Sequence, residues 1–173
     1  ENDLTFEEFD KDKLASKMAY EGDFKPYFTY IADSLKKFSS QRDRQKGEAY
    51  VHGFTLAMTS QCKFYRPISE LDNKGGYADI FLSPLCDIYE DMTDSYIVEL
   101  KYCKSNTSDA QVQKLFKEAA SQVSRYADSD LVKELVKTTR LHQLVVIYRG
   151  VDMVVCEELK YECPDVCGAA GGA

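Results

Sequence analysis

Two acids and one lysine, Asp79, Glu99 and Lys101, have the residue types and the spacing of a metal-assisted catalytic site. Residues 95–103 form a near-continuous apolar run that predicts a buried strand, on which Glu99 and Lys101 share a face, about 6.6 Å apart. Asp79 lies on the preceding predicted strand, 77–82, and antiparallel neighbours can bring an acid on one strand beside an acid on the next. Because two carboxylates on one face repel each other unless a cation or proton lies between them, the pair predicts a metal.

The chemistry that such a site supports is phosphoryl chemistry. Mg²⁺ prefers oxygen ligands and keeps several waters. When bound, it lowers the pKa of a water and stabilises charge on a phosphoryl oxygen. Lys101, held beside it, is placed to orient the attacking water or to neutralise the transition state. The competing interpretation is an exposed Glu99–Lys101 salt bridge on an edge strand, a common and weak pair; the nearby Asp79 favours the metal site.

The elements that must position these residues follow in the order three helices, three strands, two helices and two strands. The predicted helices are 10–21, 24–38, 41–60, 109–128 and 130–138, and the predicted strands are 64–71, 77–82, 95–103, 144–148 and 153–156. A hairpin turn is expected at residues 72–76, and an acidic loop at 84–94. This order predicts an α/β fold, a mixed sheet flanked by helices, with a helical N-terminal part over residues 1–40.

Length and composition predict one soluble domain. The chain has 173 residues, of which 44% are hydrophobic and 29% charged, and no stretch approaches the roughly 18 apolar residues of a membrane span. We expect the domain to cover residues 1–167, with 168–173 as a flexible tail or a cloning remnant. No signal peptide is visible at the start, so we expect a cytoplasmic protein that does not bind membranes.

The six cysteines are expected to be reduced thiols, because their spacing has no regular framework. Cys156, Cys163 and Cys167 cluster near the end of the chain. A structural zinc ion there would need a fourth donor, and neither His52 nor His142 is near them in sequence.

Four segments together resemble the PD-(D/E)XK nuclease superfamily. Two are Gly76-Tyr77-Ala78-Asp79-Ile80 and Ile97-Val98-Glu99-Leu100-Lys101. The others are residues 48–54, which resemble the helix that supplies a further acid, and residues 118–127, which resemble the Gln-x-x-x-Tyr helix. The resemblance covers about residues 20–150, and it is closest to the nuclease-like C-terminal domain of bacterial proteins with a predicted AAA-type ATPase part.

The resemblance implies a restriction-endonuclease-like fold and a nuclease that uses Mg²⁺ or Mn²⁺ on nucleic acid, with DNA expected. It implies Asp79, Glu99, the Leu100 carbonyl and Glu48 as metal ligands, Asp79, Glu99 and Lys101 as catalytic residues, and Gln122 and Tyr126 in the substrate groove. It also implies an ATPase domain elsewhere in the full-length chain, because no phosphate loop occurs in this sequence. Two positions depart from the family pattern: Ala78 replaces the proline, and Tyr77 replaces a basic residue.

Several of these residues also have simpler interpretations. Glu48 and His52 are four apart and would share a helix face as an ordinary surface pair. For His52 we expect a structural or supporting role, with general acid or base chemistry as the alternative. Gln122 and Tyr126 would form an ordinary helix pair, and His142, just before a predicted strand, would be structural.

The net charge of −7 favours a second hypothesis for the whole chain, because affinity for phosphates comes mostly from clustered Lys and Arg. In that hypothesis the domain has weak or no catalytic activity and serves recognition or assembly within a larger ATPase-containing protein.

Overall fold

A computed structural model describes residues 3–40, 47–73 and 76–159. Its helices are α1 (Asp3–Glu21), α2 (Lys25–Phe38), α4 (Glu48–Ser60), α5 (Asp109–Ala127) and α6 (Asp130–Leu135). Its strands are β1 (Tyr65–Asn73), β2 (Gly76–Pro84), β3 (Asp94–Cys103), β4 (Arg140–Arg149) and β5 (Asp152–Glu158). The order of helices and strands is the one that the sequence predicts, and the N-terminal helical part is present as α1 and α2.

The five strands form one mixed sheet in the order β1-β2-β3-β4-β5. β1 and β2 form an antiparallel hairpin, which confirms the predicted turn, although Lys74 and Gly75 at its tip lie outside the described residues. β2 and β3 are also antiparallel, whereas β3 and β4 are parallel and need the long crossover that α5 and α6 provide. β3 is therefore the central strand of the sheet.

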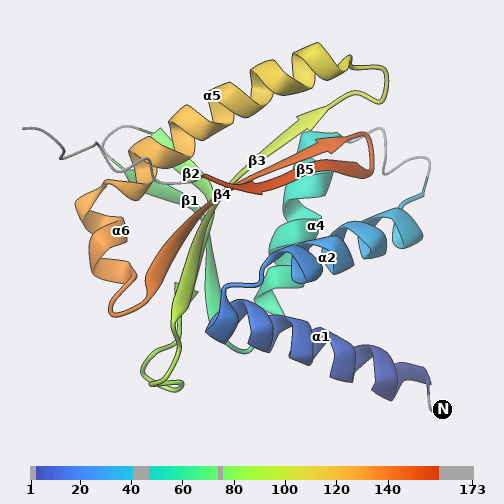
Figure 1. Cartoon of the computed structure of the whole chain (residues 1–173). Helices are drawn as coiled ribbons and strands as arrows, with labels where there is room; N and C mark the ends of the chain where they lie inside the picture. The colour runs from blue at the N-terminus through green and yellow to red at the C-terminus, as the bar shows by residue number, and fades with distance from the viewer. Residues whose placement is uncertain (1–2, 41–46, 74–75, 160–173) are drawn as a thin grey trace, which may run out of the picture.

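Helices cover both faces of this sheet (Figure 1). α1, α2 and α4 pack on one face, where β3 contributes Tyr96, Val98 and Leu100 to the core. α5 and α6 pack on the other face, where β3 contributes Ile97. Because successive side chains of a strand point to opposite faces, burial of both faces explains why residues 95–103 are almost entirely apolar.

α5 is the helix that lies across the face to which Glu99 and Lys101 belong. Ser108 begins it with a capping box, in which its hydroxyl accepts from the Gln111 amide while the Gln111 side chain accepts from the Ser108 amide. Val112, Ala119 and Val123 then recur at helical spacing and are buried against the sheet. In the described part of the chain, no helix combines the length and the apolar character that crossing a membrane requires.

Three predicted helices begin or end at other residues in the structure. α4 begins at Glu48, after Gly47, rather than at residue 41, and residues 41–46 lie outside the described part. α6 ends at Leu135, three residues before its predicted end, where the chain turns back into β4. α1 extends further toward the N-terminus than predicted, to Asp3.

The strand predicted over residues 144–148 is longer, because β4 begins at Arg140. His142 therefore lies within this strand and not before it. Its Nε2 lies 2.6 Å from Asp94 Oδ1, and its Nδ1 lies 2.7 Å from Glu158 Oε1. Arg140 Nη2 donates to the same Asp94 oxygen at 2.8 Å. These charged partners allow polar residues to occupy a buried strand end, so the expected structural role of His142 has a physical basis.

Candidate metal centre

Asp79 lies where β2 and β3 stop pairing. Their antiparallel register runs from Leu82 opposite Tyr96 to Ile80 opposite Val98. Just beyond this last pair, the Leu100 amide donates to Asp79 Oδ2 at 2.8 Å. The acid side chain thus fills the position between two separating strands, and the Asp79 carboxylate lies directly beside the main chain of the Glu99–Lys101 segment.

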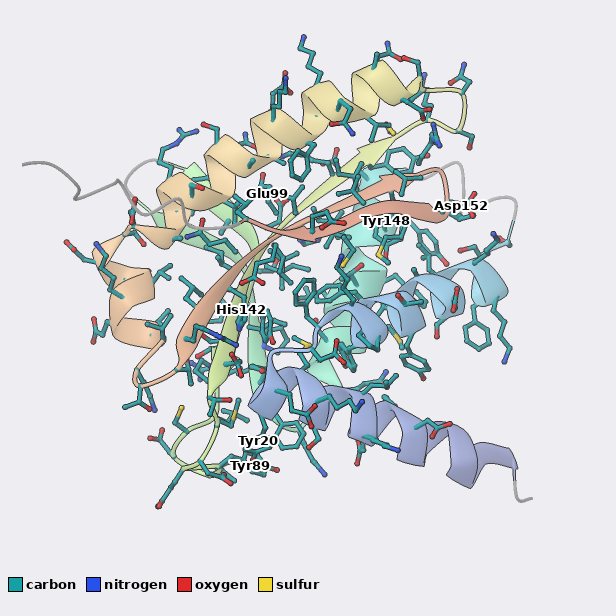
Figure 2. The ribbon with its side chains drawn as sticks, in the orientation of Figure 1. Tyr20, Tyr89, Glu99, His142, Tyr148 and Asp152 are labelled. Atoms are coloured by element: carbon teal, nitrogen blue, oxygen red, sulfur yellow. The ribbon has the colours of Figure 1, made fainter. Side chains whose placement is uncertain are left out.

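Glu99 and Lys101 share one face of β3, as their spacing predicts. Lys101 Nζ donates to Glu99 Oε1 at 2.6 Å, and only 3% of the Glu99 side chain is exposed. In Figure 2, Glu99 lies between the sheet and α5. The alternative of an exposed pair on an edge strand is therefore wrong, because β3 is central and Glu99 is buried.

Burial makes the charge of Glu99 unfavourable. Its desolvation raises the pKa of Glu99 to about 7, and the Asp79 carboxylate adds to this, while the hydrogen bond from Lys101 opposes it. Glu99 Oε2 is fully buried and has no hydrogen-bond partner within the described residues. A second carboxylate oxygen without a partner is costly in a protein interior, and an added cation would stabilise it.

The same acids change the pKa of Lys101. Burial alone lowers the pKa of Lys101, but the hydrogen bond and charge of Glu99, together with the charges of Asp79 and Glu48, raise it overall. Lys101 therefore carries a proton at neutral pH and remains partly accessible, with 21% of its side chain exposed.

A cavity of about 450 Å³ opens beside Asp79. Its lining residues are Glu48, Ala49, His52, Asp79 and Leu100. The structure thus brings together three of the four predicted metal ligands, since the first turn of α4 carries Glu48 to the point where β2 and β3 separate. The fourth, Glu99, lies next to this group but is not among the lining residues, because it points toward α5.

Gln122 and Tyr126 lie on α5, over the face that buries Glu99. Tyr126 is a buried member of the apolar core on that side, and the Arg125 guanidinium lies 5.7 Å from the centre of its ring. Gln122 Oε1 is buried and lacks a hydrogen-bond partner within the described part of the chain. Neither residue is among those that line the 450 Å³ cavity.

The donor set fits a hard divalent cation such as Mg²⁺. It offers the carboxylates of Asp79 and Glu99 and the main chain of Leu100, and Mg²⁺ commonly takes one or two carboxylates and keeps several waters. The buried and unpartnered Glu99 Oε2 supports this fit. Among the described residues, no three His, Cys, Asp or Glu side chains gather into a cage that could hold a metal. Two carboxylates and a main-chain oxygen suit a cation that keeps a large share of water ligands.

The described cysteines contribute nothing to this centre. Cys62, Cys86, Cys103 and Cys156 are free thiols. Cys163 and Cys167, which the sequence groups with Cys156, lie outside the described residues.

His52, for which the sequence predicts a structural or supporting role, lies beside the predicted ligands. His52 Nε2 lies 3.2 Å from the main-chain oxygen of Asp79, and His52 lines the same cavity as Glu48. The spacing of four residues from Glu48 was the available signal, because it places both side chains on one face of α4.

The structure is thus an α/β protein with a mixed sheet covered by helices on both faces, and it has acids and a lysine where two strands separate. A family model described as the PD-(D/E)XK nuclease superfamily matches residues 46–158. The chain therefore belongs to the PD-(D/E)XK nuclease superfamily, and its fold is restriction-endonuclease-like. No curated protein and no solved structure matched the chain.

Membership of this superfamily gives the coarse chemistry. Its members are generally nucleases or other phosphodiesterases, act on nucleic acids, and typically use divalent metals. The matched residues include β2, β3 and α5 and therefore every predicted site residue from Glu48 to Tyr126.

Proposed function

We propose that this protein is a nuclease domain that hydrolyses phosphodiester bonds of DNA with Mg²⁺ or Mn²⁺. Asp79, Glu99, the Leu100 carbonyl and Glu48 would hold the cation. The observation that carries the proposal is the buried Glu99 carboxylate, which lies beside a second acid and has one oxygen with no partner among the described residues. A cation at this place would remove the repulsion between the two acids.

Lys101 and Asp79 have separate roles in this proposal. When bound, the cation supplies electrostatic stabilisation of charge on a phosphoryl oxygen and lowers the pKa of a water. Lys101 keeps its proton and presents an ammonium group to the attacking water or to the charge of the transition state. Asp79 is held by the Leu100 amide, so its carboxylate does not have to be ordered when substrate arrives.

We place the substrate groove along α5, with Gln122 and Tyr126 beside it. Gln122 Oε1 supports this assignment, because it has no hydrogen-bond partner among the described residues and a buried polar atom normally has one. Exposed basic residues of the same helix, such as Lys114 and Lys117, are available for phosphate contacts.

The test combines metal titration with cleavage. We expect calorimetry to detect Mg²⁺ and Mn²⁺ binding by the wild type, and Asp79→Ala and Glu99→Ala to abolish it. Asp33→Asn, an exposed acid on α2, serves as the matched control and should bind as the wild type does. Lys101→Ala should keep metal binding but lose at least about 100-fold in DNA cleavage, the size of effect seen when one transition-state donor is removed. Equal, negligible cleavage by wild type and Lys101→Ala would refute the enzyme hypothesis.

A second function deserves a test because the net charge is −7. In this alternative, the same centre is retained in a recognition or assembly module of a longer chain that carries an AAA-type ATPase. The free thiols of the described residues agree with a reducing compartment, and we propose the cytoplasm. Metal binding without cleavage of single- or double-stranded DNA or RNA would favour this module over the nuclease.

A further inference from the structure

His52 makes a contact that connects α4 to β2, the strand that carries Asp79. Its Nε2 lies 3.2 Å from the main-chain oxygen of Asp79. A carbonyl oxygen only accepts hydrogen bonds, so Nε2 must carry the proton for this bond to exist. The imidazole therefore holds the backbone of Asp79, and does so from α4, which is remote from β2 in the sequence.

Asp79 is consequently held at two points. His52 holds its main chain, and the Leu100 amide holds its carboxylate at 2.8 Å. This double attachment lies just past the Ile80–Val98 pair, where the register between β2 and β3 ends. Asp79 remains within the β1–β2 ladder, between the Ile80–Ser69 and Ala78–Leu71 pairs, and loses strand pairing only on its β3 side. The two contacts restrain Asp79 where the pairing with β3 is missing.

We propose that His52 is a positioning residue that fixes the Asp79 carboxylate for its cation. The inference rests on the proposed metal site, and it adds the mechanism by which α4 and β2 are aligned. Glu48 and His52 are four residues apart on α4, and both line the 450 Å³ cavity. A single helix face thus carries one proposed ligand and also anchors the strand that carries another.

The first experiment measures the geometry without any metal. Amide hydrogen exchange by NMR reports the Leu100 amide, whose hydrogen bond depends on the position of the Asp79 carboxylate. We expect His52→Leu to speed exchange at Leu100 by at least about tenfold, and to leave the Val98 amide, within the paired part of β3, unchanged. Unaltered exchange at Leu100 would overturn the proposal, whether or not the protein is a nuclease.

The second experiment measures Mg²⁺ and Mn²⁺ affinity by calorimetry. Loss of a group that orients a metal ligand typically weakens metal binding by about 10- to 100-fold, and we expect a loss in this range for His52→Leu. His52→Gln keeps an N–H donor at a similar reach and should restore binding to within about threefold. His52→Asn is too short to reach the Asp79 carbonyl and should behave as His52→Leu does.

A stability control separates positioning from general loosening of α4. Thr59→Val removes a buried hydroxyl that donates within the same helix and lies away from the cavity. If Thr59→Val lowers the free energy of unfolding as His52→Leu does but binds metal normally, the effect at His52 is one of positioning. If both variants lose metal equally, or if His52→Gln fails to rescue, His52 only stabilises the helix. Asp79→Ala keeps the two proposals separate: unchanged metal binding there refutes the metal site itself.

Discussion

Glu99 is the residue at which the metal-free protein carries an electrostatic cost. Its carboxylate is buried beside Asp79. The Lys101 ammonium donates to one of its oxygens, and the other has no partner in the part of the chain that the structure describes. A buried carboxylate in this situation either accepts a proton or attracts a cation. The same residue therefore links the folding stability of the protein to its proposed function.

The stability of the metal-free protein should depend on pH through Glu99. The pKa of Glu99 is raised from 4.5 to about 7 in the folded state. The unfolded state binds fewer protons between these values, so the contribution is complete below pH 4.5 and is lost as pH rises through 7. We expect Glu99→Gln to gain up to about 3 kcal/mol relative to the wild type between pH 5 and pH 8 in EDTA.

Urea denaturation at a series of pH values measures this difference. Glu90→Gln, at an exposed position of the acidic loop, is the control and should follow the wild-type curve. Parallel curves for Glu99→Gln and the wild type would show that the Glu99 carboxyl does not titrate near neutral pH.

The pattern of residues predicts only part of this chemistry. Period-two alternation was enough to place Glu99 and Lys101 on one face, and the hairpin before Asp79 was enough to predict its neighbourhood. The contact between Asp79 and the Leu100 amide was not predictable, because it depends on where β2 and β3 separate. The position at which a strand pair ends is a tertiary property, and the local sequence does not encode it.

At the scale of elements, the N-terminal helices are joined to the sheet through the link between α1 and α2. Gly22 in this link has a φ of +70°, a left-handed conformation that favours glycine. A Cβ there would lie 2.6 Å from Arg140 Nη2 and 3.2 Å from His142 Cε1. The link therefore packs directly over the side chains of Arg140, His142 and Asp94. Figure 2 shows His142 well separated from Glu99 along the sheet.

Replacement of Gly22 by alanine should destabilise the protein by about 2 kcal/mol, through left-handed backbone strain and displacement of Arg140. Chemical denaturation at neutral pH gives the number. Gly53→Ala is the matched control, since a Cβ at this exposed position of α4 meets no atom within 4 Å. Alanine there should stabilise the helix by about 0.5 to 1 kcal/mol. Equal effects at the two glycines would contradict the proposed strain at Gly22.

The polar residues around His142 explain why the sequence predicts β4 to begin only at residue 144. Arg140, His142 and Gln143 are polar, so the apolar pattern begins only at Leu144. Burial raises the pKa of Asp94, but hydrogen bonds from His142, Thr93 and Arg140 outweigh it and lower the pKa overall. Partners from β3 and β5 make a polar strand end stable, and these partners are distant in sequence.

At the scale of the whole molecule, the fold and the charge point in different directions. The order of elements and the mixed sheet follow from sequence periodicity, and the family model confirms the fold. The net charge of −7, however, opposes binding to a polyanion unless basic residues are concentrated on one face. The location of charge relative to the sheet therefore decides binding more than the total does, and two faces can be compared directly.

Two charge reversals make this comparison, and each raises the net charge by two. Glu118→Lys places a new cation on α5, one turn before Gln122, while Asp33→Lys places it on α2, on the opposite face of the sheet (Figure 1). If the substrate lies along α5, only Glu118→Lys should strengthen DNA binding, several-fold at low salt, and steepen the dependence of log affinity on log salt by about one. Fluorescence anisotropy in the presence of Mg²⁺ measures the DNA binding. Both reversals are made in a Lys101→Ala background, which prevents cleavage during the measurement. Equal gains from both reversals would mean that DNA responds to net charge alone, and the groove along α5 would have to be abandoned.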